Sequence, residues 1–154
     1  MTTSNQTSIR EGKRTSVQTV TLAVGAVFLL VGILGFVPGI TSGVDQLTFA
    51  GHQSGAMLLG LFQVSILHNI VHLLFGVVGL ALSRSWPGSR SYLIWGGAIY
   101  LVLWIYGLVI GHESPANFVP LNTADNWLHF VLGVAMIALG ILLSRRAVDR
   151  VRAE

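Results

Sequence analysis

The chain contains no cysteine among its 154 residues, so disulfide bonds and thiolate chemistry are both excluded. Charged residues are scarce as well, because Asp, Glu, Lys and Arg together make up only 10% of the chain. Away from the two ends, the acidic residues are limited to Asp45, Glu113 and Asp125. G-x-S-x-G, P-loop, dinucleotide-binding and H-E-x-x-H motifs are absent too. These absences disfavour an enzyme without excluding one.

What the sequence has instead is long apolar stretches. Hydrophobic residues account for 53% of the chain. Four stretches each approach or exceed the ~20 residues that a helix needs to cross a ~30 Å hydrocarbon core. They are Val17–Val37, Leu58–Leu82, Tyr92–Ile110 and Trp127–Leu143. The sequence therefore predicts an all-α protein, a bundle of four transmembrane helices surrounded by the lipid bilayer.

The basic residues predict the orientation of this bundle. With four spans, all nine Lys and Arg residues fall on one face, because residues 38–57 and 111–126 contain none. The positive-inside rule then places both termini in the cytoplasm. The isoelectric point near 10 follows from this topology, and we expect no nucleic-acid partner.

The ends of the chain differ in composition from the spans. The first apolar stretch is longer than the ~7–15 residues of a signal-peptide core, and no small-residue cleavage pattern follows it, so we expect an uncleaved anchor. Residues 1–16, rich in Ser, Thr, Asn and Gln, are expected to form a disordered cytoplasmic tail. Residues 17–144 are the predicted four-helix transmembrane domain, and residues 145–154 a basic cytoplasmic tail whose last residues are also disordered.

An internal repeat relates the two halves of the chain. The second and fourth stretches share the pattern N-x-x-H-x-x-x-G at an offset of 57 residues, and the first and third share three glycines at an offset of 72. The matched pairs are Asn69 with Asn126, His72 with His129, Gly76 with Gly133, Gly25 with Gly97, Gly35 with Gly107, and Gly39 with Gly111. The sequence thus predicts two tandem helical hairpins related by a pseudo-twofold axis along the membrane normal.

Glycine also lets membrane helices approach closely. The segments GFVPG and GLVIG both have the G-x-x-x-G spacing that is typical of such contacts. For any single pair, simple tolerance of glycine in membrane helices explains the spacing equally well. The glycines that we expect to pack helices are Gly35, Gly39, Gly76, Gly107, Gly111 and Gly133.

The repeat gathers six polar side chains at one depth, in the outer half of the bundle. His68 and His72 are four residues apart and therefore share one helix face, and Asp125 and His129 have the same spacing. Because polar groups that face lipid are costly, we expect this polar cluster to face the bundle axis. It comprises His68, Asn69, His72, Asp125, Asn126 and His129.

Three interpretations of the polar cluster stay open. It can supply only hydrogen bonds between helices, in a structural bundle without cofactor that assembles with itself or with a larger membrane complex. It can hold a cofactor of a redox accessory protein: a transition metal on His68, His72, His129 and Asp125, or a b-type haem between His72 and His129. It can also form a proton or quinone pocket. The remaining histidines, His52 and His112, are expected at the surface.

Two segments, LHNIVHLLFGVVGL and LNTADNWLHFVLGV, resemble an uncharacterised family of small bacterial four-helix integral membrane proteins. This domain of unknown function is common in high-GC Gram-positive bacteria. The likeness covers about residues 17–144, and L-H-N-x-x-H and A-D-N-x-L-H are its specific parts. The resemblance implies a multi-pass protein of the bacterial plasma membrane and assigns no activity. It also leads us to expect Asn where this chain has Ser65, so that a hydroxyl replaces one amide. A looser likeness to small four-helix proteins associated with quinol oxidation keeps a quinone-linked function open.

Overall fold

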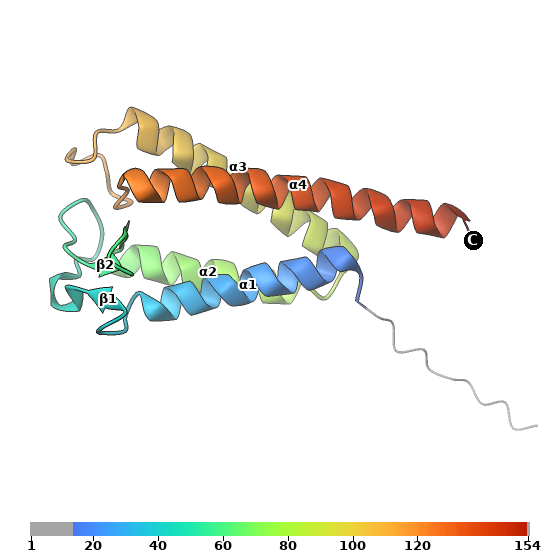
Figure 1. Cartoon of the computed structure of the whole chain (residues 1–154), viewed down its shortest axis with the longest axis horizontal. Helices are drawn as coiled ribbons and strands as arrows, with labels where there is room; N and C mark the ends of the chain where they lie inside the picture. Colours follow the sequence, from blue (N-terminus) through green and yellow to red (C-terminus); the bar gives the residue numbers. More distant parts are fainter. Residues whose placement is uncertain (1–13, 154) are drawn as a thin grey trace, which may run out of the picture.

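Four helices dominate the structure, a computed structural model that describes the backbone of residues 14–153 and the side chains of residues 14–144. Figure 1 shows the helices running along the length of the molecule. The expected four-helix fold is confirmed, and three helices are long and apolar enough to cross a membrane, whereas α2 is shorter, with 17 residues. The helices are α1 (Ser16–Leu34), α2 (Ile66–Leu82), α3 (Trp86–Val109) and α4 (Thr123–Ala153).

The structure describes one of the two predicted tails and not the other. Residues 1–13 of the N-terminal tail lie outside the described part of the chain. At the other end, α4 continues through Ala153, so the backbone of the basic C-terminal segment is helical where the sequence suggested a disordered end. The segment contains no helix-breaking residue before that point, and it extends α4 beyond the apolar span that ends near Ser144.

The helices pair as two hairpins, because α1 packs mainly against α2 and α3 mainly against α4. A Cβ atom added to Gly25 would lie 3.0 Å from the carbonyl oxygen of Gly76, and one added to Gly97 would lie 2.7 Å from that of Gly133. These distances are tighter than ordinary van der Waals contact, so each glycine is required where the two backbones of its hairpin cross. The same close contact therefore occurs at matched positions of both hairpins.

The two G-x-x-x-G motifs behave differently from the prediction. Gly35 and Gly107 are tightly packed, since a Cβ added to either would collide with the side chain of an asparagine on the neighbouring helix. The predicted packing of Gly39 and Gly111 is wrong: no described atom lies within 4 Å of a Cβ added to either residue. The reason is that α1 and α3 end before them, so both glycines fall in loops, where Gly39 adopts a φ of +88°.

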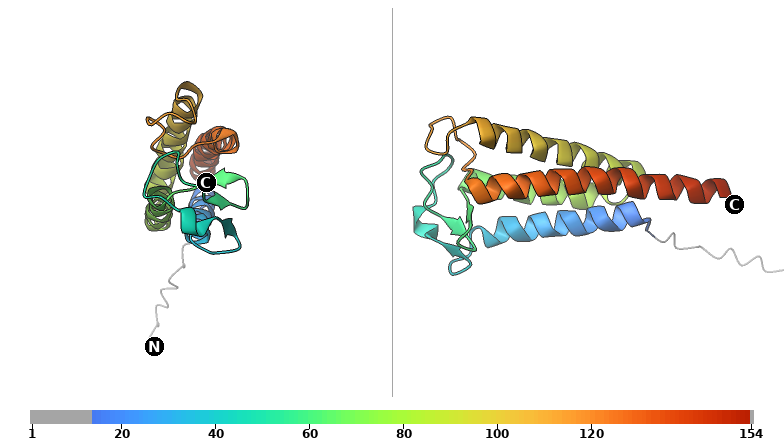
Figure 2. Two further views of the ribbon diagram at one scale, coloured as in Figure 1. Left: turned by 90° about the vertical axis from the view of Figure 1, so that its left-hand side faces the viewer. Right: turned by 45° about the horizontal axis from the view of Figure 1, so that its top comes forward.

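A small antiparallel sheet covers one end of the bundle. Its strands, in the order β1-β2-β3, are β1 (Thr41–Ser42), β2 (Met57–Leu58) and β3 (Phe62–Gln63), and a short helix η1 (Val44–Gln46) follows β1. We call these strands, η1 and the two loops at this end the cap. Figure 2 shows the cap over the end where α2 and α4 begin. The backbone N–H of Gly51 donates to the carbonyl of Phe118 at 2.8 Å and so joins the two loops.

The predicted start of the second span at Leu58 is wrong, because this part of the chain belongs to the cap. Its first residues form the β2–β3 hairpin, and α2 begins only at Ile66, where Ser65 accepts a hydrogen bond from the backbone N–H of His68 at 3.2 Å. Leu58 and Val64 are buried in a small core between the cap and α1 rather than exposed to lipid. The long apolar run therefore combines a strand hairpin that has its own small core with a shorter helix.

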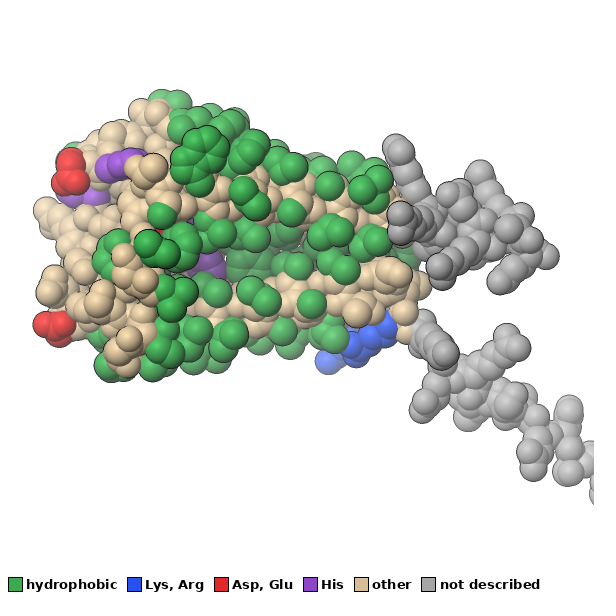
Figure 3. Space-filling model, in the orientation of Figure 1, with side chains coloured by type: hydrophobic (Ala, Val, Ile, Leu, Met, Phe, Trp, Pro, Cys, Tyr) green, Lys and Arg blue, Asp and Glu red, His purple; other side chains and the backbone are tan. Residues whose placement is uncertain are grey.

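The described basic and acidic side chains lie at opposite ends of the molecule (Figure 3). Figure 3 shows the described Lys and Arg side chains at the end opposite the cap, and Asp and Glu side chains at the cap. We call these two ends the basic end and the cap end. Between them, the outward faces of the helices carry exposed apolar side chains such as Val27, Val102 and Val131. This arrangement fits a protein that crosses a bilayer.

Candidate functional site

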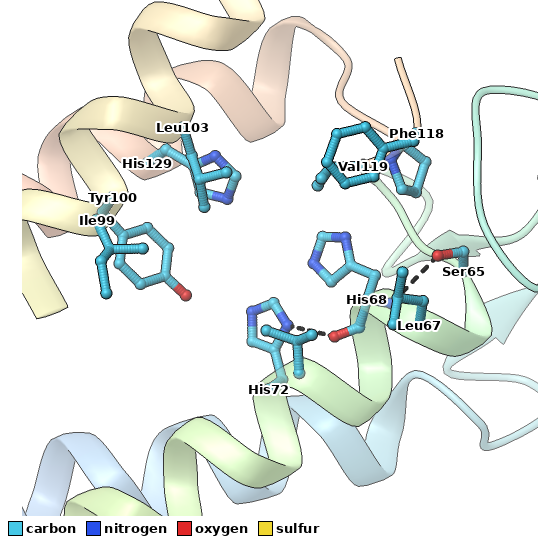
Figure 4. Close-up of a pocket in the computed structure, with 12 residues that line it drawn as sticks. Ser65, Leu67, His68, His72, Ile99, Tyr100, Leu103, Phe118, Val119 and His129 are labelled. Atoms are coloured by element: carbon cyan, nitrogen blue, oxygen red, sulfur yellow. Dashed lines mark hydrogen bonds between the residues drawn. The ribbon is translucent and has the colours of Figure 1, made fainter. Parts of the chain in front are cut away.

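A cavity of about 280 Å³ lies between the two hairpins, near the cap end. Figure 3 shows a hollow between the hairpins with histidine side chains inside it. The lining is mainly apolar and comes from α2, α3, α4 and the loop before α4, as Figure 4 shows. It includes His68, Val71 and His72 of α2, Ile99, Tyr100 and Leu103 of α3, Phe118, Val119 and Pro120 of the loop, and His129 of α4.

The two histidines of α2 are stacked one helical turn apart. Their ring centroids are 4.5 Å apart and their planes differ by 3°. Nδ1 of His72 lies 3.0 Å from the backbone carbonyl oxygen of His68. Since a carbonyl oxygen can only accept, Nδ1 must be the protonated nitrogen, and Nε2 of the neutral ring is left as an acceptor. Figure 4 shows this second nitrogen on the side of the ring that faces Tyr100.

The third histidine reaches the cavity from the other hairpin. His129 is 3% exposed, and its ring meets that of Tyr100 edge-on, with 5.0 Å between centroids. Nδ1 of His129 and Nδ1 of His68 are both buried, and neither has a hydrogen-bond partner among the described residues. Buried polar atoms in proteins are nearly always hydrogen-bonded, and the same lack of a partner is found at Nδ2 of Asn69 and Oδ1 of Asn126, which lie outside the cavity lining.

Aromatic rings outside the lining pack behind His72 and Tyr100. Phe28 of α1 lies between the hairpins, with its ring 5.6 Å from His72 and 5.6 Å from Tyr100, where it is stacked. Phe75 of α2 packs edge-on against Phe28 at 5.0 Å. Figure 4 shows the Tyr100 hydroxyl directed into the cavity, and among the described residues it forms no hydrogen bond. The cavity therefore has one phenolic hydroxyl at its side, on a tyrosine that other rings hold in place.

The two asparagines of the predicted polar cluster lie behind the cavity and pack within the hairpins. Asn126 donates from Nδ2 to the carbonyl of Gly107 at 3.0 Å, and it fills the space that this glycine leaves. Asn69, 1% exposed, occupies the matching position against Gly35. His112, expected at the surface, is half-buried, with Nε2 3.5 Å from Nδ2 of Asn126. Both asparagines thus hold two helices of one hairpin together.

Asp125 also faces away from the cavity. Its carboxylate accepts from the backbone N–H groups of Gln63 and Asn122, each at 3.1 Å, while Asn122 Oδ1 accepts from the backbone N–H of Asp125 at 2.9 Å. This is a capping box at the start of α4 that also holds strand β3. In the repeat Asp125 is matched with His68, so equivalent positions serve different purposes.

The predicted metal site is consequently not assembled. Among the residues that the structure describes, no three His, Asp or Glu side chains form a group that could hold a metal ion. The carboxylate of Asp125 is already occupied by two backbone N–H groups, which removes it from the predicted set of His68, His72, His129 and Asp125. Three of the six residues in the polar cluster, the histidines, come together around the cavity.

Sequence analysis missed Asn117, which orders the loop that closes the cavity. This residue is 2% exposed; its side chain donates to the carbonyls of His112 and Leu121 and accepts from the backbone N–H of Leu121. Phe118, the next residue, lines the cavity. The available signal was an Asn between two prolines, a residue type that commonly bonds to nearby backbone in turns.

Comparison with known proteins gives one match. Residues 18–142 match the model of a protein family described as "Domain of unknown function (DUF4383)". No curated protein and no solved structure matches the chain significantly. The expectation of an uncharacterised family is confirmed, and the family description assigns no activity to the cavity.

Proposed function

The chain belongs to the DUF4383 family, and we propose that it is a membrane protein that binds a lipid-soluble small molecule in the cavity between its two hairpins. One observation carries the proposal: three histidine side chains, His68 and His72 from one hairpin and His129 from the other, line a single, mainly apolar cavity. An apolar cavity with a few convergent polar groups is the usual form of a small-molecule site.

A purely structural function accounts for only half of the polar cluster. Asn69, Asn126 and Asp125 pack helices or satisfy backbone groups, as expected of a bundle whose polar residues fix its assembly, although Nδ2 of Asn69 and Oδ1 of Asn126 have no partner among the described residues. The three histidines do not: among the described residues, only the ring of His72 forms a hydrogen bond, and that bond stays within its own helix. Ionisable residues within a membrane are rare, and they commonly mark functional sites.

Exposure of the lining residues supports access from the bilayer. Val71 of α2, Ile99 of α3 and Phe118 of the loop line the cavity and are 50%, 52% and 56% exposed. The cavity thus reaches the surface between α2 and α3, where lipid surrounds the protein. If the basic end lies in the cytoplasm, as the positive-inside rule predicts, this opening is in the outer leaflet.

The proposed site also lies between two related halves. The matched contacts of Gly25 with Gly76 and of Gly97 with Gly133 support an internal repeat of two hairpins about a pseudo-twofold axis. Membrane proteins built from repeats commonly bind their ligands where the repeats meet. The two sides of this cavity differ, because α2 contributes two histidines and α4 contributes one. Divergence of the two halves would explain this difference.

Thermal unfolding of the full-length protein in lipid nanodiscs tests the proposal. The probes are three ring compounds that dissolve in the bilayer: a short-chain prenylated hydroquinone, the matching quinone and a sterol. At least one should raise the melting temperature, because a ligand at 100 times its Kd stabilises the folded state by about 2.7 kcal/mol.

Two variants separate the cavity from the lipid-facing surface. Leu103→Trp fills the cavity and should abolish the shift, whereas Leu108→Trp, at a 61% exposed position of the same helix, should retain it. A shift that persists in Leu103→Trp, or the absence of any shift, would refute the proposal and leave a structural or interaction bundle. A Soret absorption band in the purified protein that His72→Ala abolishes would instead establish the haem-binding alternative.

A further inference from the structure

The hydrogen-bond donor and acceptor atoms that face the cavity restrict which ligand can bind there. On the basis of the proposed function, we infer that the ligand is a lipid with a single phenolic ring, whose hydroxyl accepts a hydrogen bond from Tyr100 and donates one to Nε2 of His72. The two partners come from different hairpins, α3 and α2, and both line the cavity.

The acceptor is fixed by the backbone. Nδ1 of His72 donates to the carbonyl oxygen of His68 at 3.0 Å, and this bond is available wherever α2 is helical. The neutral imidazole has one donor and one acceptor, so Nε2 offers only a lone pair to the cavity. The ring is also held in place by neighbouring rings, by His68 stacked at 4.5 Å and by Phe28 tilted at 5.6 Å between centroids. A ligand group that meets Nε2 must therefore donate.

The donor is held with similar precision. The ring of Tyr100 lies between Phe28, stacked at 5.6 Å, and His129, edge-on at 5.0 Å. These contacts direct its hydroxyl into the cavity on the side of His72, as Figure 4 shows. A group placed between this hydroxyl and Nε2 of His72 must donate to the imidazole nitrogen and can accept from the hydroxyl. A hydroxyl does both, whereas a ketone or an ether accepts only and leaves the imidazole nitrogen unpaired.

Size and lining favour an aromatic ring that carries this hydroxyl. The cavity of about 280 Å³ is slightly below the ~300–1,000 Å³ of pockets that hold drug-sized ligands, so it suits one ring rather than a sterol. Ring faces and edges of Tyr100, Phe118 and the histidines form much of the wall, and aromatic rings pack well against each other. An alkyl or prenyl tail would leave between Val71 and Ile99 into the lipid.

Head groups that share one tail test this inference. The full-length protein in nanodiscs is titrated, under anaerobic conditions, with a prenylated hydroquinone, its dimethyl ether and its quinone, and binding is followed by the melting temperature. We expect the hydroquinone to bind at least tenfold more tightly than either of the others, because only it can donate to His72. Equal affinity for all three would overturn the inference but leave the proposed function intact, whereas no binding by any would overturn the inference, and the proposed function with it if the sterol also fails to bind.

Two variants test whether Tyr100 and His72 cause the preference for the hydroquinone. Tyr100→Phe removes the donor and His72→Phe removes the acceptor while keeping a ring, so each should reduce the preference for the hydroquinone to less than threefold. Tyr92→Phe is the matched control, because this hydroxyl donates to the carbonyl of Phe75 outside the cavity lining, and the tenfold preference should persist. A preference that survives in both Tyr100→Phe and His72→Phe would overturn the inference, as would a straight-chain alcohol that binds as tightly as the hydroquinone.

Discussion

Asn69 and Asn126 show how a polar side chain becomes part of a membrane helix pair. Each lies in the first or second turn of its helix and fills a space that exists only because the facing helix has a glycine, Gly35 or Gly107. An amide in this position removes its own polar atoms from lipid and at the same time fixes the height of one helix against the other. The asparagine and the glycine are therefore one structural unit, repeated in both hairpins.

Replacing this glycine should be costly. We expect Gly107→Ala to lower the free energy of unfolding by about 1–3 kcal/mol, because the added methyl displaces Asn126 and breaks its hydrogen bond to residue 107. Gly111→Ala is the control, since an added Cβ there meets no described atom within 4 Å. Chemical unfolding in detergent micelles, followed by circular dichroism, measures both. Equal stability of the two variants would show that the Asn–Gly unit contributes nothing to the fold.

At the residue scale, the sequence could predict which residues belong to the polar cluster. It could not predict which of them line the cavity and which pack elsewhere. Spacing and repeat alignment place His68 and Asp125 at matched positions, yet one lines the cavity and the other caps α4. The difference arises from Asn122, which completes a capping box with Asp125, and from the backbone N–H of Gln63. That N–H comes from a strand that apolar periodicity could not reveal within a long hydrophobic run.

Among the elements, the β2–β3 hairpin departs most from the sequence-based expectation. Hydrophobicity predicted a helix from Leu58, and the chain forms a helix only from Ile66. The turn contains Leu59 and Gly60, both with positive φ, which suits a tight hairpin and not a helix. The four helices could be predicted because apolar stretches of this length are typical of membrane-spanning helices. The short hairpin, in contrast, depends on contacts with α1 and α4.

The link between this hairpin and α4 should be measurable. Asp125→Ala removes the acceptor of two backbone N–H groups, so we expect a loss of about 1–2 kcal/mol in unfolding free energy. Hydrogen exchange should become faster at the amides of Gln63 and Asn122, while the amides at the centre of α3 stay protected. Asp45→Ala changes an exposed acidic residue of the cap and should leave both measurements as in the wild type. Unchanged exchange at Gln63 in Asp125→Ala would contradict this function of Asp125.

For the whole molecule, the short helix α2 has a structural consequence. Its 17 residues span about 25 Å, less than the ~30 Å of the hydrocarbon core. The deficit falls at the cap end, where Leu59 and Leu61 at the tip of the hairpin are 62% and 58% exposed. These side chains extend the apolar surface beyond the start of α2, and the carbonyl of Leu61 in the turn accepts a hydrogen bond from Asn122 Nδ2.

The orientation of the molecule in the membrane can be tested because the chain has no cysteine of its own. Single cysteines at exposed positions of the cap, Ser42→Cys and Glu113→Cys, should react with a membrane-impermeant maleimide in intact cells. Ser85→Cys, exposed between α2 and α3 at the basic end, should react only after the cells are permeabilised. The basic residues drive this arrangement, since their transfer across the membrane is unfavourable. Labelling of Ser85→Cys from outside would reverse the topology and place the cavity in the inner leaflet, so that its ligand would have to come from the cytoplasmic side.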